Sequence, residues 1–341
     1  MKQYLTYDDC QIVPKLSDIQ HRKDCNTITR VTKNVWLDIP IVSSPMDTVT
    51  DYEMCLEMDK LGGMGFLHRF KSSGEITETI RLFREKKPNG IIGVSIGVTG
   101  NYLEDVQWYV DVGAQVILID VAHGHHTLVE KAIKEIKNEV KGQFDLLVGN
   151  IATAEATRDI CDWGADGIRI GIGAGSLCST RVQTGVGIPM VTSILDCVSV
   201  ADDYDVPCMA DGGVRIPADV CKAIGIGADT VMLGSLLSGT KETPGEIIKT
   251  GIWPNEILQK KYRGSASLES KMDRGEEKNI EGHSKSITYK GKTKRIINDI
   301  IDGLRSSMSY VGAGNIKEFQ SKCDFIKITN AGIVEAKPHL L

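Results

Sequence analysis

VGAQVILID (112–120), WGADGIRIG (163–171) and IGADTVMLG (226–234) are the stretches that decide the fold class of this chain. In each of them, Gly-Ala and two further residues lead into an apolar run. Such a pattern is typical of a helix that ends at glycine and turns directly into a buried strand. Its repetition predicts that one helix-and-strand unit is used several times along the chain.

Eight short apolar runs carry this repeat through the sequence, and their starts are mostly 22 to 30 residues apart. The runs are continuous rather than alternating, which indicates parallel strands that are buried on both faces. We therefore predict an α/β fold, a (β/α)8 TIM barrel with an inserted flap after the eighth strand. The predicted strands are 39–44, 63–68, 91–97, 115–120, 145–150, 167–172, 207–211 and 230–235.

A doubly wound open sheet is the alternative fold. It would normally bind a nucleotide at a glycine-rich turn after its first strand. Here the first predicted strand runs into Ser-Pro-Met-Asp at 44–47, where no such turn occurs. The barrel is therefore the favoured prediction.

Two regions lie outside the repeat. We predict that 1–341 is a single barrel domain with an N-terminal extension at 1–38 and a mobile flap at about 252–296. The flap region is polar and rich in Gly, Ser, Lys and Glu, so disorder is the alternative interpretation. An insertion after the last strand of a barrel lies at the carboxyl end, where a lid is useful. A helical pattern resumes at 293–308.

The composition excludes several classes of protein. The chain has 341 residues, 41% hydrophobic and 25% charged, with a formal net charge of −5 and no long Lys/Arg block, so we expect no nucleic-acid partner. Neither a signal-peptide pattern nor an apolar run of membrane-spanning length occurs, so we expect no membrane association. Nine cysteines without a CxxC pair argue against a disulfide scaffold or zinc ribbon and favour the reducing cytoplasm.

Residues at the carboxyl ends of barrel strands face the active site. Cys178 follows the sixth strand within IGIGAGSLCST (170–180), where glycines bring the backbone close to a small ligand. It is a candidate nucleophile, although position alone leaves a structural role open. The full set of strand-end candidates is Ser44, Met46, Asp47, His68, Ser95, Asp120, His123, Asn150, Cys178, Asp211 and Ser235.

The loops after strands seven and eight of a barrel commonly hold phosphate on backbone amides. Gly212, Gly213, Gly234 and Ser235 suit that role, although the glycines could simply make tight turns. Asp211 could accept hydrogen bonds from a ribose diol. The histidines of AHGHH (122–126) lack a further ligand at suitable spacing, so we predict exposed imidazoles at a helix N-terminus rather than a metal site.

Together these motifs resemble the IMP dehydrogenase/GMP reductase family over nearly the whole chain. The matching segments are LTYDDCQIVP (5–14), SSPMDTVT (43–50), GIGAGSLCSTRVQTGVGIP (171–189), ADGGVR (210–215), VMLGSLL (231–237) and EGHSKSITYKG (281–291). The resemblance implies a purine nucleoside monophosphate substrate, a nicotinamide cofactor, a homotetramer, and attack of Cys178 on purine C2 to give a thioimidate intermediate.

The resemblance also implies a set of site residues. Catalytic roles fall to Cys178, Thr180 and Glu281. The implied substrate-binding residues are Met46, Ser176, Asp211, Gly212, Gly213, Gly234, Ser235, Gly264, Ser265 and Gly282. The implied cofactor-binding residues are Asp120, Val121, Ala122, Asn150 and Gly173. A monovalent cation, K⁺, would be held by the backbone carbonyls of Gly173, Gly175 and Cys178.

Two branches of this family use one covalent intermediate for different reactions. The dehydrogenase oxidises IMP to XMP with NAD, and the reductase converts GMP to IMP and ammonia with NADPH. Only 22 residues separate His68 from Ile91, so the regulatory module that dehydrogenases usually carry between these strands is absent. The flap has Arg274 followed by Gly275, where dehydrogenases carry Arg-Tyr.

Glu281 in GEEKNIEG (275–282) resembles the reductase glutamate that pairs with a threonine, here Thr180. SSPMDTVT and KKYRG (260–264) resemble the dehydrogenase versions of their motifs instead. The balance favours the NADPH-dependent reductase over a dehydrogenase without the regulatory module. A binding protein that has lost turnover is the third possibility, and the intact Cys178, Thr180 and Glu281 argue against it.

Overall fold

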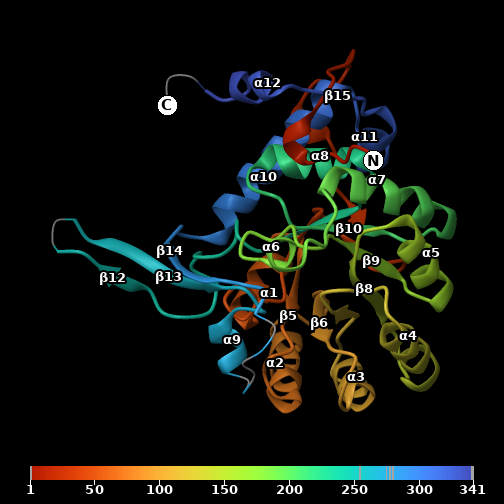
Figure 1. The fold of residues 1–341 in the computed structure, drawn as a ribbon, viewed down its shortest axis with the longest axis vertical. Coiled ribbons are helices and arrows are strands. Elements are labelled where there is room, and N and C mark those ends of the chain that lie inside the picture. The colour runs from red at the N-terminus through yellow and green to blue at the C-terminus, as the bar shows by residue number, and fades with distance from the viewer. Residues whose placement is uncertain (1, 253–254, 274, 276–277, 279, 339–341) are drawn as a thin grey trace.

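The computed structural model describes residues 2–252, 255–273, 275, 278 and 280–338. Within these residues, eight parallel strands close into a barrel, with helices on its outside (Figure 1). The predicted (β/α)8 barrel is confirmed. The barrel strands are β4 (Ile41–Ser43), β5 (Met64–Leu67), β6 (Ile92–Ile96), β7 (Val116–Asp120), β8 (Asp145–Ile151), β9 (Gly167–Ile170), β10 (Cys208–Asp211) and β11 (Thr230–Leu233).

Helices follow the barrel strands along the chain and pack on the outside of the barrel (Figure 1). They are α1 (Tyr52–Lys60), α2 (Ser73–Lys86), α3 (Tyr102–Asp111), α4 (Thr127–Glu139), α5 (Ala154–Trp163), α7 (Met190–Ala201), α8 (Pro217–Ile226) and α10 (Thr293–Val311). The Gly-Ala repeat ends helices as predicted. Gly113, Gly164 and Gly227 have φ of 100°, 110° and 127°, values that only glycine adopts without strain. No helix among the described residues is long and apolar enough to cross a membrane.

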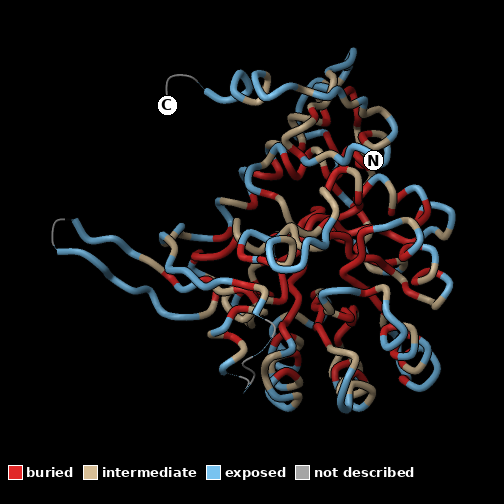
Figure 2. Tube along the Cα trace, viewed as in Figure 1, coloured by how far each residue is buried: buried red, intermediate tan, exposed pale blue. Residues whose placement is uncertain are grey.

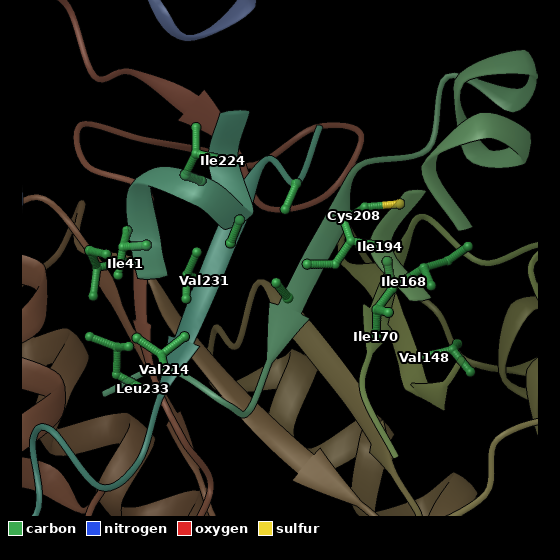
Figure 3. Packing of buried hydrophobic residues seen from close by; sticks show 14 of the residues in the cluster. Ile41, Val148, Ile168, Ile170, Ile194, Cys208, Val214, Ile224, Val231 and Leu233 are labelled. Atoms are coloured by element: carbon green, nitrogen blue, oxygen red, sulfur yellow. The ribbon is translucent and has the colours of Figure 1, made fainter. Parts of the chain in front are cut away.

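Side chains alternate between the inside and the outside of the barrel along each strand. In β7, Val116 and Leu118 belong to an inner cluster with Phe66, whereas Ile117 and Ile119 belong to the outer layer under the helices. Each such side chain, removed from water, contributes about 1.5–3 kcal/mol to folding. Figure 3 shows part of the outer layer, and Figure 2 shows that buried residues concentrate in the strands and inward helix faces.

Short pairs of strands close the barrel's amino end and join the two ends of the chain. The hairpin β2 (Thr29–Arg30) and β3 (Trp36–Leu37) contributes Val31 and Leu37 to the inner cluster. β1 (Cys10–Ile12) pairs antiparallel with β15 (Phe325–Lys327). The remaining short elements are η1 (Tyr7–Asp9), η2 (Arg22–Asp24), η3 (Asp202–Tyr204), α6 (Thr180–Thr184), α11 (Ile316–Lys322) and α12 (Asn330–Glu335).

The polar region after the barrel is largely ordered. β12 (Ile248–Thr250), β13 (Ile257–Arg263) and β14 (Ser284–Thr288) form an antiparallel sheet, with α9 (Leu268–Met272) between β13 and β14. The paired β12 and β13 extend away from the barrel (Figure 1). Polar composition suggested disorder here, but β13 alternates and buries Lys260 and Tyr262 on one face. A strand can therefore form without an apolar run.

Candidate active site

A cavity of about 740 Å³ lies at the carboxyl end of the barrel. Its walls are the loops after β4, β5, β7, β9, β10 and β11, the carboxyl end of β8, flap residues 262, 264–266, 271, 281 and 282, and residues 6–8 of the N-terminal extension. Every residue to which the family resemblance assigns a site role lines it. These residues are Met46, Asp120, Val121, Ala122, Asn150, Gly173, Gly175, Ser176, Cys178, Thr180, Asp211, Gly212, Gly213, Gly234, Ser235, Gly264, Ser265, Glu281 and Gly282.

Four strand-end candidates do not line this cavity, so the broader expectation from barrel geometry is wrong for them. Asp47 pairs with Arg263 at 2.6 Å. His68 is buried and accepts the Phe70 amide through Nδ1 at 3.2 Å, and burial lowers the pKa of its ring. Ser95 is buried and donates to a backbone carbonyl, and His123 points into solvent. Asp47, His68 and Ser95 are thus held by polar contacts with the protein itself.

The histidines after β7 serve the protein scaffold. His126 is the N-cap of α4, and its Nδ1 accepts the Leu128 amide at 3.0 Å. His125 is half-buried rather than exposed, because its Nε2 lies 2.7 Å from Asp159 Oδ2. Among the residues that the structure describes, no group of three or more His, Cys, Asp and Glu side chains is arranged to hold a metal.

The loop at 171–189 presents Cys178 to the cavity. It leaves β9 at Gly171, where φ is 140° and a Cβ would lie 2.0 Å from the Asp211 carbonyl oxygen, so no other residue fits. Cys178 is exposed, whereas Cys323 is partly buried and the remaining seven cysteines, all among the described residues, are buried. An exposed thiol between glycine-rich turns and a short helix is open to a ligand.

A hydrogen-bonded chain links this thiol to the flap. Cys178 Sγ lies 3.1 Å from Thr180 Oγ1, and Thr180 donates its hydroxyl proton to Glu281 Oε2 at 2.5 Å. A threonine hydroxyl has a single proton. Because that proton is directed at Glu281, the Thr180 oxygen faces Cys178 as an acceptor for the thiol proton.

Main-chain pairing holds Glu281 beside the thiol. Ser179 donates its amide to the Glu281 carbonyl at 2.9 Å, and His283 donates to the Leu177 carbonyl at 3.0 Å. Gly282 bridges both Cys178 and Ser267. A Cβ at Gly282 would lie 2.9 Å from the Ser267 amide nitrogen, so the flap needs glycine for this close approach.

The turns after β10 and β11 form a polar pocket beside the cysteine loop. Gly213 already donates its amide to the Ala174 carbonyl at 2.9 Å, so this amide is not directed at a ligand as the sequence suggested. Ser176 Oγ lies 3.2 Å from the hydroxyl of Tyr262, which the sequence analysis missed. Burial raises the pKa of Tyr262, so its hydroxyl remains protonated well into the alkaline range.

A buried arginine joins the two carboxylates of the cavity. Arg169, which the sequence analysis also missed, lies 2.5 Å from Asp120 and 2.9 Å from Asp211. Asn150 donates to the same Asp211 oxygen at 2.9 Å. Burial alone would lower the pKa of Arg169, but Asp211 and Asp120 together raise it. Alternation along GIRI (167–170) was the available signal, since Ile168 and Ile170 face outward and Arg169 therefore faces the barrel interior.

Backbone carbonyls of the cysteine loop suit an alkali cation by donor type. The Gly175 carbonyl accepts the Cys178 amide at 3.1 Å, which leaves a second lone pair on that oxygen. Gly173 has φ of 70°, a turn conformation that favours glycine. The cation at Gly173, Gly175 and Cys178 stays a prediction, as do the individual site roles. Arg274 lies outside the described residues.

The family model of the IMP dehydrogenase / GMP reductase domain matches residues 4–339. This chain belongs to that family. It is 35% identical to inosine-5'-monophosphate dehydrogenase of Cryptosporidium parvum, over 98% of this chain and 94% of the relative. It is 30% identical to GMP reductase of Leishmania major, over 98% of this chain and 96% of the relative.

Solved structures place the fold in the same family. A crystal structure of GMP reductase from Trypanosoma brucei in complex with guanosine 5'-monophosphate matches with a TM-score of 0.93 and 29% identity, covering 100% of this chain and 98% of that chain. The chain is therefore similar to an oxidoreductase of purine nucleotides. The alignment with the Leishmania major protein extends over 478 residues, whereas this chain has 341, so that relative contains segments without a counterpart here.

Proposed function

We propose that this protein is an NADPH-dependent GMP reductase, which converts GMP to IMP and ammonia through a covalent adduct between Cys178 and purine C2. The observation that carries the proposal is the chain from Cys178 Sγ through Thr180 to Glu281, with contacts of 3.1 and 2.5 Å. It combines a nucleophile with a route for the proton that a departing amine requires.

The first step replaces the C2–N2 bond with a C2–S bond. Cys178 gives its proton to Glu281 through Thr180, and the thiolate adds to C2. The same carboxyl then returns the proton through Thr180 to N2, which leaves as ammonia while the thioimidate forms. Atoms and charge balance with Cys178 and Glu281 alone, because one proton moves from sulfur to nitrogen.

The position of the flap favours the reductase reaction over the dehydrogenase reaction, in which water hydrolyses this adduct. Main-chain hydrogen bonds from Ser179 and His283 place flap residues on both sides of Cys178. Such a cover limits the access of bulk water to C2. A reductase must keep the adduct intact until C2 is reduced, whereas a dehydrogenase must admit water.

NADPH, when bound, supplies the hydride that reduces C2. Asp120, Val121, Ala122, Asn150 and Gly173 would hold it, since they line one continuous cavity with Cys178. Arg169 fixes Asp120 and Asp211 through ion pairs, so the cofactor end and the substrate end share one rigid support. Once C2 is reduced, Sγ leaves and the product is IMP.

The nucleotide would bind across the turns after β4, β10 and β11. Met46, Gly212, Gly213, Gly234 and Ser235 line this part of the cavity together with Ser176 of the cysteine loop. Gly264, Ser265 and Gly282 would close over it from the flap. Asp211 would accept hydrogen bonds from the ribose hydroxyls, and Tyr262 would join Ser176 at the phosphate.

Resemblance to the family supports two further proposals. The protein would act as a homotetramer and would bind K⁺ on the carbonyls of Gly173, Gly175 and Cys178. A third proposal, that it would reside in the cytoplasm, comes from its cysteines. Nine cysteines without a disulfide among the described residues suit a reducing compartment.

An IMP dehydrogenase that lacks the regulatory module is the second candidate. It is favoured by the 35% identity to the Cryptosporidium parvum dehydrogenase over 98% of this chain and by the KKYRG motif. One experiment separates the two reactions. The protein is supplied with GMP and NADPH, and separately with IMP and NAD, and absorbance of the reduced nicotinamide is followed.

The reductase predicts oxidation of NADPH with release of ammonia and IMP, and no steady formation of XMP from IMP and NAD. Steady XMP formation would identify the dehydrogenase. Cys178→Ala is the control, because it should abolish either reaction and leave the fold intact. A protein that binds GMP without turnover in either assay would be the binding protein.

A further inference from the structure

We propose that Arg181 is a positioning residue that closes the cysteine loop at its base and so holds Cys178 in its attacking position. Arg181 Nε donates to the Ile172 carbonyl at 3.1 Å, where the loop begins, and Nη2 donates to the Ile188 carbonyl at 2.5 Å, where it ends. One guanidinium therefore ties together two backbone positions 16 residues apart.

The arginine stem packs against glycines that have no room for side chains. A Cβ at Gly173 would lie 2.6 Å from Arg181 Cγ, and a Cβ at Gly187 would lie 2.5 Å from Arg181 Nε. Gly173 and Gly187 have φ of 70° and 154°. These two glycines thus form the slot that the arginine fills.

Several other contacts of the loop involve elements that belong to the ligand-binding machinery. Ser179 and Leu177 pair with the flap, and Ala174 pairs with Gly213. Those contacts depend on where the flap and the phosphate turn lie. The Arg181 bonds are internal to the loop, so they hold its two ends together whether the flap is closed or not.

Arg181 also brings a positive charge near the nucleophile. It is half-buried and lines the cavity with Cys178. Burial lowers the pKa of Arg181, and its attraction to a Cys178 thiolate works in the opposite direction. The planar guanidinium supplies both the charge and two divergent donors, whereas a lysine ammonium supplies the charge from a single nitrogen.

This inference rests on the proposed function only in so far as the turnover assays use GMP and NADPH. Because both half-reactions use the Cys178 adduct, loss of Arg181 should slow them equally. Arg181→Met should lower kcat for GMP deamination and the rate of hydride exchange between IMP and NADP⁺ each about a hundredfold, as expected for a displaced nucleophile. KM for GMP should change less than threefold, because the turns after β10 and β11 hold most of the phosphate. Arg181→Lys should be intermediate.

A nucleotide-free measurement separates this inference from the assignment as a reductase. Cys178 is the exposed cysteine of the described chain, so iodoacetamide alkylates it selectively, with Cys178→Ala as the blank. Arg181→Met should lower the alkylation rate about tenfold, and millimolar guanidinium should restore both alkylation and turnover in Arg181→Ala. Arg158→Met, at an exposed site on α5, is the matched control.

Alkylation of Arg181→Met at the wild-type rate, or equal loss of alkylation in Arg158→Met and Arg181→Met, would overturn the role. A loss confined to deamination would overturn it as well, because it would place Arg181 in the proton relay. If wild-type protein makes XMP from IMP instead, the reductase assignment fails while the alkylation and rescue results still decide the role of Arg181.

Discussion

Glu281→Gln tests the proton relay with the smallest change that the structure allows. Glutamine has nearly the same shape, and its amide oxygen can still accept the Thr180 hydroxyl, whose oxygen lies 2.5 Å from Glu281 Oε2. The main-chain contacts of residue 281, which accepts from Ser179 and donates to Ala266, do not involve the side chain. The substitution therefore removes the ability to hold a proton while leaving the flap in place.

The expected magnitude follows from what is lost. A hydrogen bond to a charged group contributes about 1.5–3 kcal/mol more than none, or about ten- to 150-fold in rate. Proton delivery by a positioned side chain contributes about a hundred- to ten-thousand-fold. We expect GMP deamination to fall within that second range. Hydride exchange should fall less than about tenfold, because exposed Cys178 can lose its proton to solvent base without Glu281.

The assay measures the two half-reactions separately. Ammonia release from GMP with NADPH reports deamination, and transfer of deuterium from C2-labelled IMP to NADP⁺ reports hydride exchange. Glu269→Gln is the matched control, since Glu269 is also a flap glutamate but pairs with Lys261 at 2.8 Å. Normal deamination by Glu281→Gln would refute the relay. Equal loss in both half-reactions would mean that Glu281 only holds the flap.

Three further predictions concern the nucleotide pocket and the flap. Gly234→Ala should fold normally and raise KM for GMP at least tenfold in steady-state kinetics, since its Cβ would lie 3.3 Å from Met46 Sδ and occupy the phosphate pocket; an unchanged KM would place the phosphate elsewhere. Tyr262→Phe should raise KM for GMP about ten- to hundredfold by removing a hydrogen bond to a charged group. Because burial raises the pKa of Tyr262, its hydroxyl stays protonated at pH values below that raised pKa. In a pH series, KM of the wild-type protein for GMP should therefore not rise near pH 10, where a free phenol ionises. A rise of KM there would contradict the role. In hydrogen-exchange measurements, GMP should slow the amides of Ser179 and His283, which join the flap to the cysteine loop; unchanged exchange would show that the flap does not respond to substrate.

The barrel could be predicted from sequence because its physical signal is local. Each strand is a short apolar run, and glycines such as Gly164 end the preceding helix in a left-handed conformation. Seven of the eight predicted strands contain the observed ones, β8 extends one residue beyond its predicted range, and the differences are confined to strand ends. The flap gave no such signal. Its strand β13 buries Lys260, whose ammonium donates to the Thr240 and Thr243 carbonyls, so a strongly polar sequence forms an ordered sheet.

The sequence predicts which residues line the site more readily than it predicts which of their side chains bond to each other. Strand ends and glycine loops identify which residues face the cavity, but the partner of a side chain depends on pairs far apart in sequence. Arg169 reaches Asp120 across 49 residues, a pair that the sequence did not indicate, and the Thr180–Glu281 pair, 101 residues apart, was predicted only through the family resemblance. Composition cannot encode such distances. Gly213 illustrates the converse, because its amide has the right location for phosphate but already has a partner in Ala174.

The flap is polar and yet ordered, and its contacts explain both properties. We call strand β13 the base of the flap and residues 281–283 its tip. The base is anchored, because burial of Lys260 and Tyr262 and the 2.6 Å ion pair of Arg263 with Asp47 fix β13 to the barrel. Main-chain bonds and the Glu281 side chain join the tip to the cysteine loop. Main-chain hydrogen bonds each contribute about 1 kcal/mol, less than a buried apolar side chain. In the proposed reductase, a tip held this way would open at low cost and close over the Cys178 adduct, so the absence of an apolar run would suit a lid over a covalent intermediate.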